Sequence, residues 1–292
     1  MAVFVAHGGA TAGSLNVGGT QAAVAAGHAA LQAGASLLDA TVEACRVLED
    51  DGGYNAGRGS HLRLDGQTVE MDAACMTGDG KFGAVVCVSD IRNPILAARR
   101  VHDTPHSVLV GVGATRFAQR LGLPPREAPS RGAVRHALEA RQLLARKGYA
   151  AETGWRLDRI LGHWNYDGPP PADLRESDTG GVVATDGAAF AAAASTGASA
   201  SPSWAAPATS ACSAPASTPD PQGRWRARAA ASPSCAPCSA AAYERLATGE
   251  SAQKAIAATL GQVEADVAVG AIAVTKDGSG AGSNCDMPWS VE

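Results

Sequence analysis

The chain has 292 residues, a formal charge of −4 at pH 7 and a pI near 6.0, which give no electrostatic reason to expect nucleic acid or an anionic membrane as a partner. Hydrophobic residues make up 46%, enough for a sizeable core in one large domain or two small ones, and no run of about 18 apolar residues predicts a membrane span. The N-terminus lacks the basic region of a signal peptide, and seven cysteines without a secretion signal indicate reduced thiols and a cytoplasmic protein.

The first half of the chain predicts paired strands and paired helices. Residues 3–6 are a short apolar run stopped by two glycines, as in a buried strand. Residues 20–32 are alanine-rich and predict a helix. A second helix is expected to begin at Ser36, where Asp39 can complete a capping box. The other expected elements are a glycine-rich loop at 51–60, strands at 68–71, 82–88 and 107–112, and helices at 94–101 and 133–146.

The second half begins with a long linker, residues 148–178, that contains three consecutive prolines. Residues 182–184 and 189–194 predict a hairpin, residues 243–260 a helix and residues 267–274 a final strand. Strands and helices thus come in pairs, which favours an α+β layered sheet protein over a regular βαβ series.

One segment lacks the large apolar residues that form a hydrophobic core. Residues 198–242 contain no Val, Ile, Leu, Met or Phe, but they hold 7 of the 16 prolines and 3 of the 7 cysteines. Such a composition cannot bury a strand or a helix of its own. We therefore expect this segment to be poorly specified and loosely coiled.

Thr179 is the first candidate for chemistry. It follows the polar run Glu176-Ser177-Asp178 and opens an apolar run. If the bond before Thr179 is cut, the residue gains an α-amine beside its own hydroxyl, and an α-amine has a pKa of about 7.7–8.0. One residue would then carry both a nucleophile and a base that is partly neutral near neutral pH. The plainer interpretation, from this segment alone, is a residue that opens a strand.

Further motifs occur in a characteristic order along the chain. They are His7-Gly8-Gly9-Ala10, Leu48-Glu49-Asp50, Tyr54-Asn55-Ala56-Gly57-Arg58-Gly59-Ser60, Glu70-Met71-Asp72-Ala73, Asn93-Pro94-Ile95, Asp178-Thr179 and Met287-Pro288-Trp289. Together they resemble the plant-type asparaginase and isoaspartyl aminopeptidase family of N-terminal-nucleophile (Ntn) hydrolases. The resemblance covers roughly residues 2–125 and 176–197 and is weaker from 243 to 289.

The resemblance implies a four-layer αββα sandwich of the Ntn-hydrolase type. It also implies a precursor that cuts itself between Asp178 and Thr179. The products would be an α subunit of residues 1–178 and a β subunit of residues 179–292, both within one domain of residues 1–292. The family further implies a dimer of such αβ units and a small-molecule or dipeptide substrate.

The resemblance also implies roles for individual residues. Thr179 would attack the side-chain amide of L-asparagine or of a β-aspartyl dipeptide, and an acyl-enzyme would then release aspartate. Thr196 corresponds to the family's second threonine, which holds the nucleophile hydroxyl; a strand-end cap is the alternative. Asn55 matches an asparagine near the scissile bond that can donate to a developing oxyanion. For Asn55 the alternative is a turn residue that tolerates positive φ.

No organic cofactor is implied, but the loop after the second expected helix resembles the family's sodium-binding loop. There, main-chain carbonyl oxygens hold the ion, and such oxygens suit a hard cation. The corresponding positions are Leu48, Glu49, Asp51, Tyr54, Ala56 and Arg58.

The sequence departs from the family pattern after the second threonine. The family's Gly-Arg-Val-Gly-Asp motif, whose arginine and aspartate hold the substrate's α-carboxylate and α-amine, and its Thr-Gly-His-Gly motif are absent as written. Residues 198–242 stand in their place. Back-translated with G+C-rich codons and shifted by one base, residues 204–219 can read Gly-Arg-Ala-Gly-Asp and then Gly-Ala-Gly-Glu-Tyr-Ala. We therefore hypothesise that this segment is largely an out-of-frame reading. Gly180, where the family usually has a bulkier residue, is a smaller departure.

Two alternatives stay open at this point. The chain can be an inactive, uncleaved product of a frameshifted gene of the same family, or a glycosylasparaginase that trims Asn-linked sugars. The lack of a secretory signal argues against the second. The sequence does not rank asparagine against isoaspartyl dipeptides, because the motif that would hold the substrate is missing.

Overall fold

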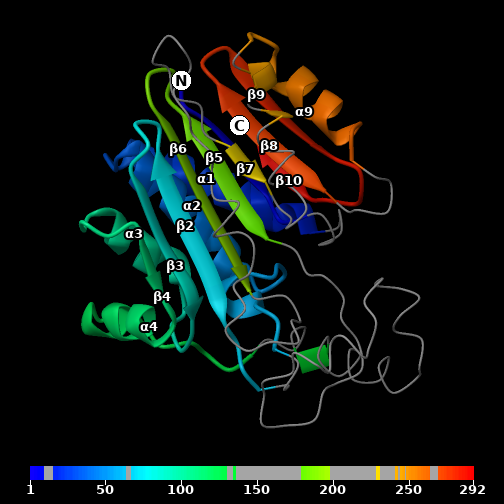
Figure 1. Cartoon of the computed structure of the whole chain (residues 1–292). Coiled ribbons are helices and arrows are strands. Elements are labelled where there is room, and N and C mark those ends of the chain that lie inside the picture. The colour runs from blue at the N-terminus through cyan, green and yellow to red at the C-terminus, as the bar shows by residue number, and fades with distance from the viewer. Residues whose placement is uncertain are drawn as a thin grey trace, which may run out of the picture.

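The computed structural model describes residues 1–9, 16–63, 67–129, 134–135, 179–197, 228–230, 241–242, 244–246, 248–263 and 269–292. Within these ranges the chain is a mixed α+β structure of two β-sheets with helices packed outside them (Figure 1). None of the helices in these ranges is long and apolar enough to cross a membrane.

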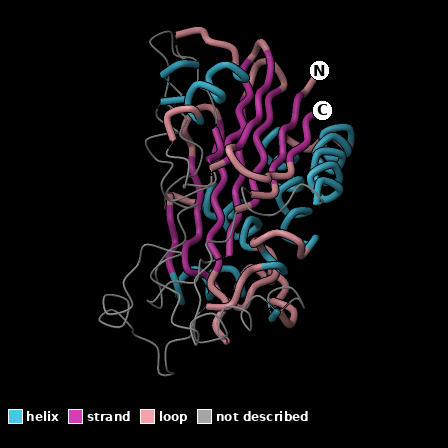
Figure 2. The backbone as a smooth tube through the Cα atoms, turned by 90° about the vertical axis from the view of Figure 1, so that its right-hand side faces the viewer, coloured by secondary structure: helices cyan, strands magenta, loops and turns pink. Residues whose placement is uncertain are grey.

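The larger sheet has seven strands in the order β10-β1-β5-β6-β2-β3-β4. Neighbouring strands pair antiparallel, except that β3 and β4 pair parallel. Because β10 pairs with β1, the two ends of the chain lie side by side, as Figure 2 shows. The strands are β1 (Val3–His7), β2 (Met71–Thr77), β3 (Phe82–Val88), β4 (Val108–Val110), β5 (Gly180–Thr185), β6 (Phe190–Gly197) and β10 (Trp289–Val291).

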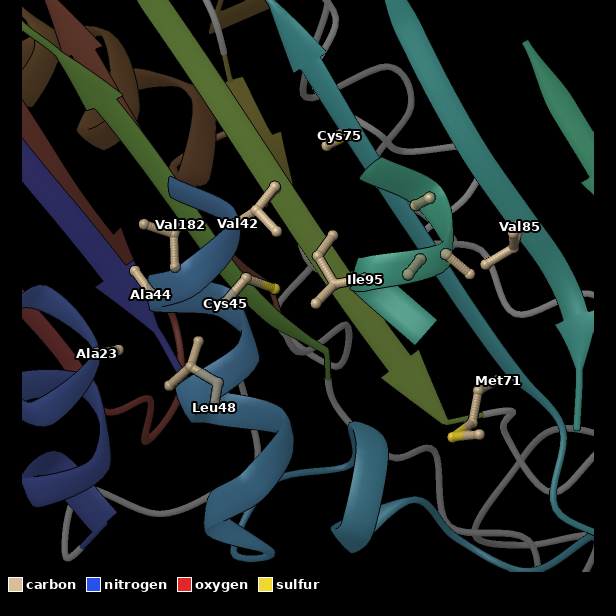
Figure 3. Packing of buried hydrophobic residues seen from close by; sticks show 14 of the residues in the cluster. Ala23, Val42, Ala44, Cys45, Leu48, Met71, Cys75, Val85, Ile95 and Val182 are labelled. Atoms are coloured by element: carbon tan, nitrogen blue, oxygen red, sulfur yellow. The ribbon is translucent and has the colours of Figure 1, made fainter. Parts of the chain in front are cut away.

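Helices cover one face of this sheet. Successive strand residues point to opposite faces, so alternate residues of each strand face these helices. Phe4 of β1 and Val182 of β5 join one buried cluster with Leu48 and Ile95, which lie on helices. Figure 3 shows Val42, Cys45 and Leu48 on one helix near Ile95 on the next. The helices of the first half are α1 (Val17–Gln32), α2 (Leu37–Asp51), α3 (Pro94–His102) and α4 (Gly111–Arg120).

A smaller sheet packs on the opposite face. It contains β7 (Arg228–Ala230), β8 (Gly270–Thr275) and β9 (Gly278–Ser283). Val5 and Val183 of the larger sheet share a buried cluster with Ile272 and Val274 of β8. Helix α9 (Ala252–Leu260) covers the outer side of the smaller sheet, where Ile256 packs with Ala273 (Figure 1).

Several sequence predictions are confirmed. The strand predicted at 3–6 is β1, the strand at 82–88 is β3, and the helices predicted at 20–32 and 94–101 are α1 and α3. Ser36 caps α2, because its side-chain oxygen accepts a hydrogen bond of 3.1 Å from the backbone N–H of Asp39. The hairpin predicted around residues 182–194 is formed by β5 and β6.

Other boundaries were predicted wrongly, each for a local reason. The strand expected at 68–71 starts only at Met71, because the carbonyl of Thr68 accepts a 2.7 Å hydrogen bond from the N–H of Arg63 and not from a neighbouring strand. The strand expected at 107–112 stops at Val110. Gly111, at a φ of 57° that favours glycine, turns the chain directly into α4.

The C-terminal predictions needed two corrections. The helix expected at 243–260 is interrupted, because a turn with Gly249 at φ 96° precedes α9. The strand expected at 267–274 corresponds to β8 but is not the last, since β9 and β10 follow it. Strand β9 reads Gly-Ser-Gly-Ala-Gly-Ser and shows no apolar alternation. Its Gly280 lies against α9, where a Cβ atom would approach the backbone of Ala252 to 2.6 Å.

The expectation that residues 198–242 supply no strand is also wrong in one place. Residues 228–230 form β7, which pairs antiparallel with β8. Most of that segment lies outside the described residues, as do the expected linker at 148–178 and the expected helix at 133–146 apart from the helical residues 134 and 135.

Candidate active site

Two buried threonines meet at one end of the β5–β6 hairpin. Thr179 lies immediately before β5 and is 7% exposed, and Thr196, near the end of β6, is 2% exposed. The two strands pair with Gly180 opposite Ser195. Extending this antiparallel register by one residue places Thr179 opposite Thr196, where Cβ atoms are typically about 5 Å apart. The sequence named both residues, and the fold brings them together.

The neighbours of the two threonines establish which face they occupy. Ser195 donates a hydrogen bond to Glu49 of α2, and a Cβ atom on Gly180 would lie 3.4 Å from the Leu48 side chain, also of α2. Both residues therefore face the helices. Because alternate residues of a strand point to opposite faces, the threonines point away from the helices, to the side on which the smaller sheet packs.

Asn55 fastens the glycine-rich loop to the end of β6. Its side-chain Nδ2 donates to the carbonyl of Gly197 at 2.9 Å, and its own carbonyl accepts from the N–H of Gly197 at 2.7 Å. Its side-chain Oδ1 accepts from the N–H of His61 at 2.9 Å. Among the described residues, the positive φ values outside glycine belong to Cys87 and Asp90, so Asn55 is not a positive-φ turn residue. The structure therefore places Asn55 beside Thr196.

The residue after Thr196 has to be a glycine. A Cβ atom on Gly197 would lie 2.2 Å from the Asn55 side chain and 2.6 Å from the Cβ of Ser60. The hydroxyl of Thr196 donates to the carbonyl of Gly197 at 2.8 Å. The close approach of loop and strand thus depends on the small residue at this position.

Glu49 was named from the sequence only for its main-chain carbonyl, yet its side chain lies directly beneath the hairpin. The carboxyl oxygen Oε1 accepts hydrogen bonds from the Ser195 hydroxyl at 2.6 Å and from the N–H of Ile95 at 2.9 Å. Glu49 and Ser195 are both fully buried. Burial raises the pKa of Glu49 to about 8, although these hydrogen bonds lower it in part.

Asp72 is a second acidic residue whose position the sequence did not reveal. It pairs with Thr196 across β2 and β6, so it lies on the same face as the two threonines. Its side chain is 1% exposed, and its Oδ1 accepts a 2.6 Å hydrogen bond from the N–H of Cys87. An aspartate between apolar strand residues was the available sequence signal.

A buried ion pair is formed by two residues that come shortly before Asp72 in the sequence. Arg63 and Glu70 approach to 2.6 Å between Nη2 and Oε2, and their side chains are 1% and 5% exposed. Their charges and that of Asp72 all act on the Cys87 thiol, whose pKa is raised to about 12, mainly by burial. This end of the sheet therefore gathers charged groups away from water.

Two glycines of the expected sodium loop pass close to carbonyl oxygens of the same loop. Leu48, Glu49 and Asp51 belong to the last turn of α2, where helix carbonyls lack helical partners. A Cβ on Gly59 would lie 2.0 Å from the Tyr54 carbonyl oxygen, and a Cβ on Gly57 would lie 2.7 Å from that of Glu49. The carbonyls of Tyr54 and Ala56 each accept one backbone hydrogen bond, and a carbonyl has two lone pairs. Main-chain carbonyl oxygens are the type of ligand that a hard cation takes. Across the described ranges, no group of three His, Cys, Asp or Glu side chains could hold a metal ion.

His7 lies on the same face as Thr179, since it pairs with Gly181 across β1 and β5. The side chain is 1% exposed, and burial lowers its pKa to about 4 because the charged imidazolium loses its hydration. The folded chain therefore stays neutral at His7 between pH 6.5 and 4, while the unfolded chain takes up a proton.

A pH prediction follows from this difference. The stability present above pH 6.5 should be lost as the pH falls toward 4, and His7 should account for up to about 3 kcal/mol of that loss, at about 1.4 kcal/mol per pKa unit. In urea unfolding between pH 7 and 4, the free energy of unfolding of the His7→Gln variant should therefore fall less steeply than that of wild type. Above pH 7 the two curves should run parallel. Equal slopes over the whole range would contradict the assigned burial effect.

Comparison with known proteins identifies the family of the chain. The family model described as asparaginase matches residues 2–201. The plant-type L-asparaginase of Thermococcus kodakarensis is 38% identical over 208 residues, which cover 68% of this chain and 63% of that protein. The isoaspartyl peptidase of Escherichia coli is 37% identical over 209 residues, covering 67% and 61%. An isoaspartyl peptidase/L-asparaginase of Mus musculus is 42% identical over 133 residues, covering 42% and 40%. The alignments thus span less than two thirds of these relatives' lengths. With its model matched over most of its length, the chain belongs to the asparaginase family of hydrolases.

Proposed function

We propose that the chain is the precursor of an N-terminal threonine amidohydrolase that hydrolyses L-asparagine to L-aspartate and ammonia and cleaves β-aspartyl dipeptides. The observation that supports the proposal is the burial of Thr179 and Thr196 at the same end of the paired strands β5 and β6, where Asn55 bonds to Gly197. Family membership supports the reaction class.

Maturation would begin with cleavage between Asp178 and Thr179. Asp178 lies outside the described residues, whereas Thr179 begins the described part of the hairpin. Cleavage converts the Thr179 amide nitrogen into an α-amine with a pKa of about 7.7–8.0, so a useful fraction is neutral at physiological pH. That amine can accept the proton of its own hydroxyl as the hydroxyl attacks.

Hydrolysis would then proceed in two steps. The Thr179 oxygen bonds to the side-chain carbonyl carbon of the substrate, and the α-amine passes the proton to the departing ammonia or amino acid. Water attacks the resulting ester and releases aspartate, which restores the hydroxyl. The Thr196 hydroxyl, on the opposite strand, is suited to orient the nucleophile. The Asn55 side-chain amide lies at the end of β6 and carries N–H groups, the type of donor that can stabilise a developing oxyanion.

The finer architecture belongs to the same proposal. The chain would adopt the four-layer αββα Ntn-hydrolase fold as one domain, with subunits of residues 1–178 and 179–292, and would form a dimer of αβ units. A sodium ion would be held by the main-chain carbonyls of the loop that ends α2. It would supply a fixed positive charge that keeps those carbonyls in place beside Asn55.

Intact-mass measurement combined with N-terminal sequencing tests the proposal. Purified protein should yield two fragments, one of which begins with Thr179-Gly180-Gly181, and should release ammonia from asparagine and aspartate from a β-aspartyl dipeptide. Activity in a chain that stays at 29.3 kDa would refute the mechanism. A glycosylated asparagine serves as a third substrate, and its preferential hydrolysis would identify a glycosylasparaginase instead.

A second candidate is an inactive, uncleaved product of a gene with an altered reading frame. One observation favours it. The family match ends at residue 201, and the segment without large apolar residues begins at residue 198. Resequencing the DNA that encodes residues 198–242 tests it. An unambiguous in-frame reading, together with processed and active protein, would rule it out.

A further inference from the structure

We propose that the side chain of Glu49 is a positioning residue that holds β6 so that Thr196, and through it Thr179, faces the reaction side of the sheet. The inference rests on the proposed function. It concerns a side chain behind the reacting face, which would act through Ser195 and would not touch substrate.

The first support is the pair of hydrogen bonds that meet on one oxygen. Oε1 of Glu49 accepts from the Ser195 hydroxyl at 2.6 Å and from the N–H of Ile95 at 2.9 Å. Ile95 is the second residue of α3, where backbone N–H groups have no helical partner. One carboxyl group at the end of α2 therefore joins β6 to the start of α3.

The second support is the contact between Glu49 and the loop that carries Asn55. A Cβ atom on Gly57 would lie 2.5 Å from the Cβ of Glu49, so the loop backbone passes against this residue. The same loop reaches Gly197 through Asn55. Displacing Glu49 would therefore disturb the β6 end from two sides, once through Ser195 and once through the loop.

The third support is strand alternation. Ser195 and Thr196 are consecutive on β6, so a bond that holds Ser195 toward the helices also holds Thr196 toward the opposite face. Gly180, which pairs with Ser195, offers no side chain to fix the register from β5. The link to Glu49 is thus the side-chain contact that anchors this register pair among the described residues.

A purely structural contact would not need a carboxyl group here. Replacing a buried polar pair by apolar side chains of similar volume is often neutral or stabilising. The hydrogen-bonded acid does what an apolar side chain cannot do, because it gives the Ser195 hydroxyl one direction in which to point.

Four variants separate positioning from stability. Glu49→Leu removes both hydrogen bonds at similar volume, whereas Glu49→Gln keeps an oxygen that accepts both. Ser36→Ala removes the cap at the other end of the same helix, at a typical cost of about 1 kcal/mol, and serves as the matched control. Ser195→Ala removes the same link from the strand side, for the case that Glu49→Leu does not fold.

The expected readout is a split between kcat and KM. Glu49→Leu should lower kcat by about a hundredfold, as a misplacement of about 1 Å does, with KM within about twofold of wild type. It should also slow the appearance of the fragment that begins at Thr179. Ser195→Ala should change kcat in the same direction, and Glu49→Gln should restore most of it. Ser36→Ala should lower the melting temperature and leave kcat unchanged. An unchanged kcat in both Glu49→Leu and Ser195→Ala, or an equal loss in Ser36→Ala, would overturn the proposal.

Hydrogen exchange decides the same question without activity. Backbone amides of residues 190–197 should exchange faster in Glu49→Leu than in wild type and should be unaffected by Ser36→Ala. If wild type neither cuts itself nor hydrolyses asparagine, the proposed function fails, and this measurement alone judges Glu49. Equal exchange in wild type and Glu49→Leu would then overturn the positioning role.

Discussion

The Thr179→Ala variant is expected to remain a single chain of 29.3 kDa and to release no measurable ammonia from asparagine. The substitution removes the only hydroxyl that the proposed reaction uses as nucleophile, and losing a catalytic nucleophile typically costs on the order of 10⁶-fold in kcat. It also removes the side-chain oxygen that would attack the preceding carbonyl during self-cleavage. Intact-mass spectrometry and an ammonia assay on the same preparation measure both effects.

Two controls sharpen this result. Thr179→Ser keeps a hydroxyl and should still be cut, although more slowly. Thr185→Ala changes the threonine at the other end of β5, which is also buried and donates to the carbonyl of Ala189 at 2.8 Å. It should lose stability of about 1 kcal/mol while keeping both processing and hydrolysis. Ammonia release by Thr179→Ala above the level of a blank would show that another residue is the nucleophile.

The second large effect is expected at the buried ion pair. Arg63→Met should lower the free energy of unfolding by about 3–5 kcal/mol, because it removes the positive charge that balances the buried Glu70 carboxylate. The double variant Arg63→Met/Glu70→Leu should recover most of this loss, since it removes both charges and keeps the volume. Urea unfolding of single chains, prepared on the Thr179→Ala background, measures the difference without interference from cleavage.

An exposed pair provides the matched control for this prediction. Lys81 and Asp103 approach to 4.0 Å, and their side chains are 52% and 51% exposed. Lys81→Met should cost less than about 1 kcal/mol, because water screens such a pair. If Arg63→Met costs no more than Lys81→Met, the buried pair contributes little and the assigned role is wrong.

Local signals in the sequence predicted most of the elements that form the larger sheet and its helices. Ser36 and Asp39 mark the start of α2, and the fully apolar run at 82–88 is β3. Strand β9 could not be predicted in this way. Helix α9 packs against Gly280 and Gly282 of this strand, and a contact with a helix leaves no apolar alternation in the strand.

The sequence predicted the two threonines of the candidate site but not the side chains that surround them. Thr179 and Thr196 belong to one hairpin, so local pattern and resemblance were enough to name them. The Ser195–Glu49 bond joins residues 146 positions apart, and nothing in either local segment indicates the other. Asp72 likewise gains its place beside Thr196 only through the pairing of β2 with β6.

The strand order of the larger sheet has a consequence for a chain cut before Thr179. Strand β1 would belong to the first fragment, yet it is hydrogen-bonded between β10 and β5 of the second. The pairing of β6 with β2 forms another seam between the fragments. The two fragments would therefore share one sheet. They should co-elute in native chromatography and separate only when denaturant unfolds the sheet.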